Sequence, residues 1–146
     1  MNIKALFVFT LLLSGTAFAA PANKDTLFYC QFNNGKQVRI EQHGDKIRYR
    51  FGKNLARPEL VFDLPKDQVF LNRLTPLLDN NRRGEIIEIY IGSYMVIATT
   101  ISDRTVYRLS FKHSGTEHEI TCKKRSVFLN RDMALELPDL PNTLTY

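Results

Sequence analysis

The sequence lacks most of the residue patterns on which enzymes depend. It has only two cysteines and no Cys-x-x-Cys pair, so a redox or zinc site of that type has little support. None of its seven glycines belongs to a glycine-rich loop of the kind that cradles phosphate groups. Ser93 lies in Gly92-Ser93-Tyr94, which does not fit the Gly-x-Ser-x-Gly turn of a serine nucleophile. We therefore expect no catalytic residues, no cofactor and no enzyme activity.

Histidine is equally sparse. His43 and His113 fall in or beside predicted turns, whereas His118 follows on the next predicted strand. His113 and His118 could face each other across a hairpin. No cysteine, aspartate or third histidine completes a set at a recognisable spacing, and a structural zinc ion takes four ligands. We therefore expect no metal site.

Long hydrophobic runs are missing after the N-terminus, so no later segment is predicted to span a membrane. At the N-terminus itself, Lys4 precedes an apolar run, Ala5–Leu13, which is too short for a membrane anchor. Ala17-Phe18-Ala19 then provides small residues at a cleavage site. This pattern predicts a signal peptide over residues 1–19, cut between Ala19 and Ala20.

The short signal peptide is typical of bacteria and predicts a periplasmic protein. Cys30 does not lie at the first mature position, so no lipid anchor is indicated. Residues 20–146 have a length that fits one β domain with one core. We expect the C-terminal tail, from about residue 138, to be loosely held.

The charge balance is basic but modest. Lysine and arginine number 20 against 15 acidic residues, a formal net charge of +5. This excess favours anionic partners such as acidic proteins, lipid A phosphates or polyanionic glycans, although it also serves solubility. A nucleic-acid partner is not expected, because no recognition motif for one is present.

Cys30 and Cys122 are predicted to form a disulfide, because an even cysteine count in an oxidising compartment usually means a bridge. The alternatives are two free thiols or an intermolecular bridge. Both cysteines fall on the apolar faces of the first and last clear strands. A bridge between them is expected to tie the two ends of the sheet together.

Period-2 alternation of apolar and polar residues dominates the chain after the signal peptide and predicts half-buried strands. Asn33–Lys36 and His43–Asp45 are typical hairpin turns. The segment Pro65–Leu78 is less regular and predicts a short helix or an edge segment, while Val127–Leu137 predicts a short strand or helix. We predict an all-β fold in which an antiparallel meander of about eight strands forms a sandwich or small barrel.

Basic side chains supply the candidate binding residues. Arg48 and Arg50 point the same way from one predicted strand, and Lys123-Lys124-Arg125 follows the second cysteine. Charged rows on a sheet are usually just solvated, but they can also form a docking surface for an acidic partner. The residues predicted to bind a partner are Arg48, Arg50, Lys53, Arg57, Arg82 and Arg83.

Several short motifs together resemble a pattern found in small secreted bacterial β-proteins. They are Cys30, Lys36-x-Val38, Ile47-x-Tyr49-Arg50-Phe51-Gly52-Lys53, Pro58-Glu59-Leu60, Tyr107-x-Leu109 and Ile120-x-Cys122. In general plan the chain is similar to periplasmic lysozyme inhibitors and to immunity proteins that neutralise cell-wall toxins. The resemblance implies a soluble periplasmic inhibitor or immunity factor with a protein partner. The alternative is an envelope module that binds lipopolysaccharide or another anionic glycan.

Overall fold

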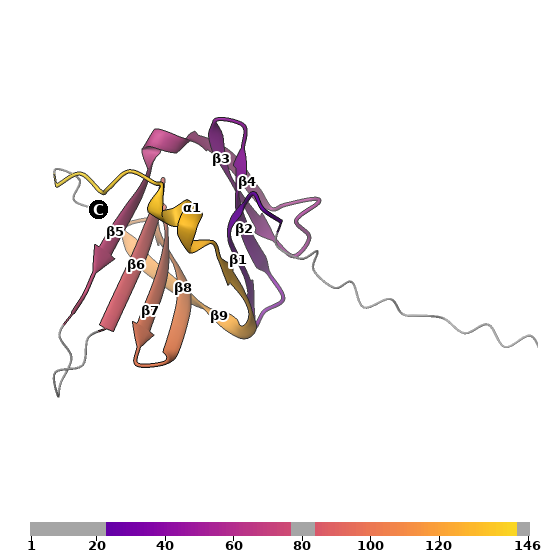
Figure 1. Cartoon of the computed structure of the whole chain (residues 1–146). Helices are drawn as coiled ribbons and strands as arrows, with labels where there is room; N and C mark the ends of the chain where they lie inside the picture. The colour runs from indigo at the N-terminus through magenta and orange to yellow at the C-terminus, as the bar shows by residue number, and fades with distance from the viewer. Residues whose placement is uncertain (1–22, 77–83, 143–146) are drawn as a thin grey trace, which may run out of the picture.

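The computed structural model describes residues 23–76 and 84–142, and most of these residues lie in nine β-strands (Figure 1). The predicted signal peptide lies outside the described residues. The first four strands are β1 (Thr26–Phe32), β2 (Gln37–His43), β3 (Lys46–Gly52) and β4 (Leu60–Pro65). A short 3-10 turn, η1 (Lys66–Gln68), leads to β5 (Val69–Leu74), β6 (Gly84–Ile91), β7 (Tyr94–Ile101), β8 (Arg104–His113), β9 (Thr116–Leu129) and the helix α1 (Arg131–Leu135).

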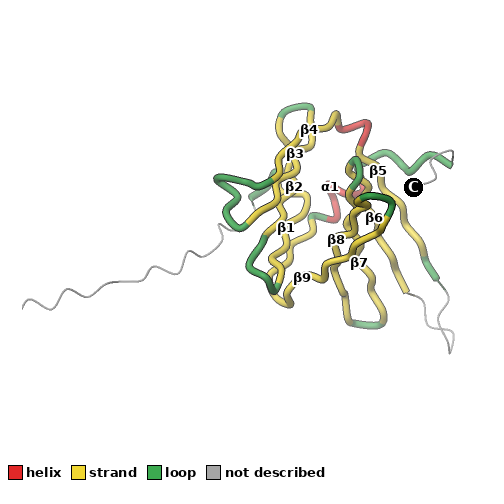
Figure 2. Tube along the Cα trace, turned by 180° about the vertical axis from the view of Figure 1, so that it is seen from behind, coloured by secondary structure: helices red, strands yellow, loops and turns green. Residues whose placement is uncertain are grey.

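All nine strands form one antiparallel sheet in the order β4-β3-β2-β1-β9-β8-β7-β6-β5. Two meanders, β1–β4 and β5–β9, face each other as the walls of a nearly closed barrel (Figures 1 and 2). The predicted all-β class and antiparallel meander are confirmed. The structure has one strand more than the eight or so that the pattern predicts. The additional strand is β5, at an edge of the sheet, and it lies in the segment Pro65–Leu78, where the pattern allowed a short helix or an edge segment.

The predicted hairpin turns are present between the first three strands. Gly35 and Gly44 have φ values of 80° and 65°, which an L residue with a side chain rarely adopts. The Asn34 side chain accepts a hydrogen bond from the backbone N–H of Lys36 at 3.0 Å. These turns place β1, β2 and β3 side by side with their apolar faces directed inwards.

Strand β9 turns a corner from one meander to the other. Its first part pairs with β8 as far as Thr121, and its last residues, Val127–Leu129, pair with β1. Arg125, in the segment between these parts, has a left-handed φ of 65°. A bulge of this kind lets one strand leave one layer and enter another.

The disulfide between Cys30 and Cys122 is confirmed and lies at this corner, with a Cα–Cα distance of 5.7 Å. The order of strands along the sequence suggested that the bridge would tie the two ends of the sheet together, but it does not. β1 and β9 are neighbours in the middle of the sheet, and the edges are β4 and β5. The bridge therefore joins the two meanders to each other.

The core fills the space between the two walls. Phe28, Val38 and Ile40 contribute from the first wall, and Ile89 and Val96 from the second, all at 1% exposure or less. Burying side chains of this size contributes about 1.5–3 kcal/mol each to folding. Because every second residue of a strand points inward, the alternation in the sequence translates directly into this core.

The C-terminal segment closes over β1 and β5. β9 continues to Leu129, and the Asn130 side chain accepts the Met133 N–H at 3.1 Å to begin α1. Leu137 is buried, and Leu71 of β5 forms backbone hydrogen bonds with Pro138 and Leu140. The loose tail expected from about residue 138 stays a prediction, although these contacts attach its first residues to the sheet edge.

Candidate functional site

Arg48 and Arg50, two of the predicted binding residues, lie on the outer face of β3 and are engaged within the sheet. Arg48 makes a bidentate pair with Asp63 of β4, with N–O distances of 2.8 and 2.9 Å. Arg50 pairs with Glu41 of β2 and donates a second hydrogen bond to the Leu55 carbonyl at 3.1 Å. The sheet therefore neutralises both arginines, and their role in partner binding stays a prediction.

The Arg48–Asp63 pair also shifts the acidity of its carboxylate. The hydrogen bonds from Arg48 hold the pKa of Asp63 below its ordinary value, with further help from the Arg48 charge. The same hydrogen bonds raise the pKa of Arg48. Both shifts favour the charged pair at neutral pH.

Lys53 and Arg57 lie exposed on the connection between β3 and β4. Neither side chain forms an ion pair with a described residue, although the Lys53 backbone N–H donates to Glu59 at 3.3 Å. The Glu59 carboxylate binds Lys36 Nζ at 2.6 Å, which lowers the pKa of Glu59. Arg82 and Arg83, the remaining predicted binding residues, lie outside the described residues.

A further basic group lies at the turn of β9. Lys123, Lys124 and Arg125, here called the basic corner, are consecutive and exposed, and they form no ion pair with any residue of the described segments. Ser126 Oγ donates to the carbonyls of Lys123 at 2.7 Å and Gln31 at 3.2 Å, which holds the backbone of the corner against β1.

The basic corner was visible in the sequence as a basic run but was not among the predicted binding residues. Three consecutive cations interrupt the apolar–polar alternation immediately after Cys122. That interruption is the sequence signal for an irregular, exposed segment, because a regular strand directs every second side chain inward. Only the pairing of β9 with two different strands shows that the run forms a corner.

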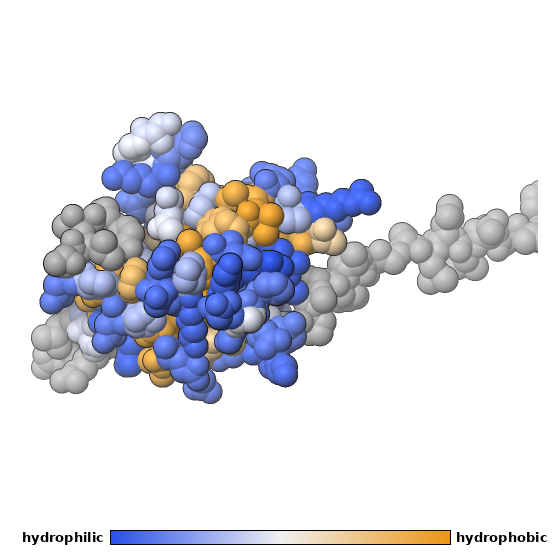
Figure 3. Space-filling view, turned by 90° about the horizontal axis from the view of Figure 1, so that it is seen from above, coloured by the Kyte–Doolittle hydropathy of each residue, from blue (hydrophilic) through white to orange (hydrophobic). Residues whose placement is uncertain are grey.

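Polar and charged residues cover most of the surface seen in Figure 3, and hydrophobic residues occupy small areas of it. The large apolar side chains that are exposed lie on several different elements. They are Val61, Leu74, Ile101, Val106, Phe128 and Leu135. They therefore do not belong to one element of the fold.

An aromatic stack crosses the core between the two walls. Tyr49 of β3 stacks on Phe62 of β4, at 4.8 Å between ring centroids, and on Tyr94 of β7, at 4.7 Å, and Phe62 and Tyr94 also stack on each other at 5.7 Å. Tyr94 continues to Phe111 of β8, which stacks on His118 of β9 at 5.3 Å. These contacts between aromatic rings help to fix the two meanders relative to each other.

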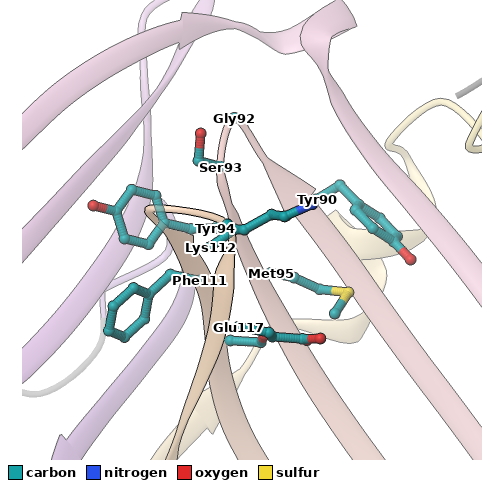
Figure 4. Close-up of a pocket in the computed structure, with 10 residues that line it drawn as sticks. Tyr90, Gly92, Ser93, Tyr94, Met95, Phe111, Lys112 and Glu117 are labelled. Carbon is teal, nitrogen blue, oxygen red and sulfur yellow. The ribbon is translucent and has the colours of Figure 1, made fainter. Parts of the chain in front are cut away.

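Two hollows lie beside these rings. One is an open pocket of about 260 Å³ between Tyr49 and Leu60 on one wall and Leu109 on the other. The second is a broader groove of about 720 Å³ around the turn that joins β6 and β7. Tyr94 and Phe111 line both. In Figure 4 they project to one side of β7 and β8, while Tyr90, Met95 and Glu117 project to the other.

Histidine pairing across the β8–β9 hairpin does not occur. His118 lies opposite Phe111, and His113 lies opposite Thr116. Within residues 23–76 and 84–142, no group of three or more metal-ligating side chains is close enough to hold an ion. In the same segments, no helix is long and apolar enough to cross a membrane.

Comparison of the chain with known protein families, with characterised proteins and with solved structures found no match.

Proposed function

We propose that the protein is exported to the periplasm, where it binds and inhibits an enzyme or toxin that attacks the cell wall. The signal peptide pattern supports export, and the Cys30–Cys122 disulfide is compatible with an oxidising compartment. The observation that carries the proposal is the basic corner, three cations presented together without an acidic partner in the described part of the chain.

The basic corner differs from the basic residues that are paired within the chain. Seven other basic residues of the described segments form ion pairs within the chain. They are Lys36, Arg48, Arg50, Lys66, Arg73, Arg108 and Arg131. Other exposed cations, such as Lys53 and Arg57, also form no ion pair with a described residue, but in the described segments only the basic corner places three cations in a row.

The geometry of the corner carries a cost in stability. Arg125 adopts a left-handed conformation, which costs a residue with a Cβ about 1 kcal/mol or more. Three adjacent like charges repel each other as well. The disulfide at Cys122 and the Ser126 hydrogen bonds hold the corner in place despite this cost. Strain retained at an exposed charged turn is typical of a binding site.

The chemistry of cell-wall hydrolysis offers a matching surface. Glycoside hydrolases place two carboxylates about 5–9.5 Å apart in the cleft that holds the glycan. Such a cleft is acidic, and the basic corner has the complementary charge. Electrostatic complementarity of this kind speeds association and selects partners.

The test uses the mature, oxidised protein immobilised as bait for periplasmic extract at near-native salt. The variant Lys123→Glu/Lys124→Glu/Arg125→Glu reverses the basic corner, and Lys24→Glu/Arg104→Glu/Lys112→Glu reverses three exposed cations elsewhere. We expect the wild type and the second variant to retain one protein, identified by mass spectrometry, and the corner variant to lose it. The captured protein should lose cell-wall hydrolase activity when the wild type is added.

Binding to lipopolysaccharide or another anionic glycan is the second candidate, favoured by the same three cations. It is distinguished by the absence of a captured protein, together with binding of the glycan through charge that weakens steeply as the ionic strength rises. Binding of purified lipopolysaccharide that disappears at high salt, together with no captured protein, would replace the inhibitor proposal with this one.

A further inference from the structure

Strand β4 is an open edge of the sheet. β4 and β5 are the terminal strands, and the edge of β5 is covered where Leu71 forms backbone hydrogen bonds with Pro138 and Leu140. Within the described residues, β4 pairs with β3 alone. Natural sheets usually protect such an edge with a lysine, a bulge or a covering segment. β4 contains no lysine, and it pairs with β3 in unbroken register.

Val61 and Asp63 direct their backbone groups toward this open edge. Lys66 donates its backbone N–H to the Asp45 carbonyl at 3.3 Å, and β4 continues the same register along β3. Residues of an antiparallel ladder alternate between facing the partner strand and facing away from it, so Phe62 faces β3 whereas Val61 and Asp63 face away. Both of these residues are exposed. Only 28% of the Asp63 side chain is exposed, so the backbone of this residue is itself open to solvent.

The side chains of β4 suit pairing with a second copy of the same strand. Antiparallel pairing centred on Phe62 places Val61 opposite Asp63 of the second copy, where their outward N–H and C=O groups can exchange hydrogen bonds. On the inner face, Leu60 then lies opposite Leu64, and the two Phe62 rings meet at the two-fold axis. These three apolar side chains are only half-buried in the single chain, so a second copy would cover more of their surface.

Charge selects this register over its neighbours. A register centred on Asp63 would set two carboxylates opposite each other, and one centred on Val61 would set Asp63 opposite Glu59 of the second copy. Like charges that lie directly opposite destabilise a sheet. In the register centred on Phe62, Asp63 faces an apolar side chain instead, and Arg48 of its own chain already neutralises its charge.

We propose that two copies of the chain associate through their β4 strands, so that one sheet continues across both molecules. The pairing is short, because Pro65 at the end of the strand has no N–H to donate. A symmetric contact of this small size forms a reversible dimer rather than an obligate one. It contains none of the residues of the basic corner, so the proposal is independent of the proposed inhibitor function.

The test measures the molecular mass of the mature, oxidised protein by sedimentation equilibrium from about 1 μM to about 1 mM. We expect the wild type to pass from monomer to dimer over this range. Val61→Glu places a carboxylate opposite Asp63, and Val61→Pro removes an N–H that points away from β3. Each should weaken dimerisation by about tenfold or more. Val61→Lys should not weaken it, because the new cation faces Asp63.

Matched controls use Val106, which is 47% exposed on β8, a strand inside the sheet. Val106→Glu and Val106→Lys make the same changes of charge on an exposed valine that has no open edge beside it. Neither should alter dimerisation. The proposal is overturned if the wild type stays monomeric over the whole range, or if Val61→Glu and Val106→Glu weaken the dimer equally.

Amide hydrogen exchange locates the contact without any substitution. As the fraction of dimer rises, the N–H groups of Val61 and Asp63 should exchange more slowly, because they become bonded to the second copy. The N–H of Phe62, which faces β3, should change much less. A dimer that leaves the exchange of Val61 and Asp63 unaltered would place the contact elsewhere and contradict the proposal.

Discussion

At the scale of single residues, cross-strand register decides what each charged side chain does. Arg48 lies opposite Asp63 in the β3–β4 ladder, and Arg50 lies diagonally from Glu41 across β2 and β3. Side chains that are directly or diagonally opposite come within reach of each other. Arg50 is thereby bound to its own sheet, while Arg57, on a loop outside any ladder, stays exposed and without an ion pair to a described residue.

The Arg48–Asp63 pair predicts a pH-dependent contribution to stability. Because the folded protein lowers the pKa of Asp63, the carboxylate stabilises the fold above the ordinary aspartate pKa of about 3.9. That contribution is lost as the pH falls through the lower folded value. Asp63→Asn should therefore lower the thermal midpoint by a few degrees at most near neutral pH, since exposed ion pairs contribute little.

Thermal midpoints of the wild type and Asp63→Asn, measured from about pH 7 down to about pH 3, check this prediction. The difference between the two proteins should shrink as the pH falls. Asp103→Asn, in the exposed β7–β8 turn, serves as the control because Asp103 forms no ion pair within the described segments. A difference that grows with acidity would contradict the assigned role of Asp63.

At the scale of elements, β9 and the segment after it connect the parts of the fold. β9 belongs to both meanders, because it pairs first with β8 and then with β1. The chain then passes through α1 and reaches the edge of β5, where backbone hydrogen bonds to Leu71 cover part of that edge. An uncovered edge strand invites pairing with other chains, so this cover protects the sheet.

Packing of the segment after α1 is tested by two neighbouring leucines. Leu137 is 4% exposed and belongs to the core cluster, whereas Leu135 is 52% exposed. Leu137→Ala should lower the free energy of unfolding by about 2–3 kcal/mol, and Leu135→Ala by less than about 0.5 kcal/mol. Urea unfolding curves measure both values. Equal small effects would mean that the segment does not pack as described.

At the scale of the whole molecule, the two meanders are held together in three ways. β1 and β9 pair in the middle of the sheet, the Cys30–Cys122 bridge crosses the same junction, and the Tyr49–Tyr94 stack spans the core. The two walls thus share one core and should unfold together in a single transition. The bridge closes a long loop, with a sequence separation of 92 residues.

Loss of the disulfide should destabilise the protein substantially. In the chain-entropy account, a bridge that closes a loop of this length stabilises the fold by about 4–5 kcal/mol. Cys30→Ala, Cys122→Ala and the double variant should therefore all unfold at much lower urea than the oxidised wild type. The wild type in reductant should approach the double variant. An unchanged melting temperature in the single variants would refute the stabilising role of the bridge.

Much of the fold could be predicted because its signals are local. Alternation along β3 placed Ile47 and Tyr49 on the inner face and Arg48 on the outer face, and Asn33–Lys36 marked the first hairpin. The strand at 69–74 was less clear, since Pro65 and Pro76 flank it and its apolar pattern is short. Its strand conformation depends on pairing with β6, which lies beyond the reach of local pattern.

The candidate site was predicted less completely, because its elements meet only in space. The sequence by itself determined the all-β class, the hairpins and two cysteines facing the core, since each follows from the alternation of neighbouring residues. Only the tertiary structure decided that β1 and β9 adjoin at the centre of the sheet and that Asp63 and Glu41 neutralise the arginines of β3. The physical reason is that side-chain direction is set by the local backbone, whereas strand order and charge pairing depend on contacts between residues far apart in the chain.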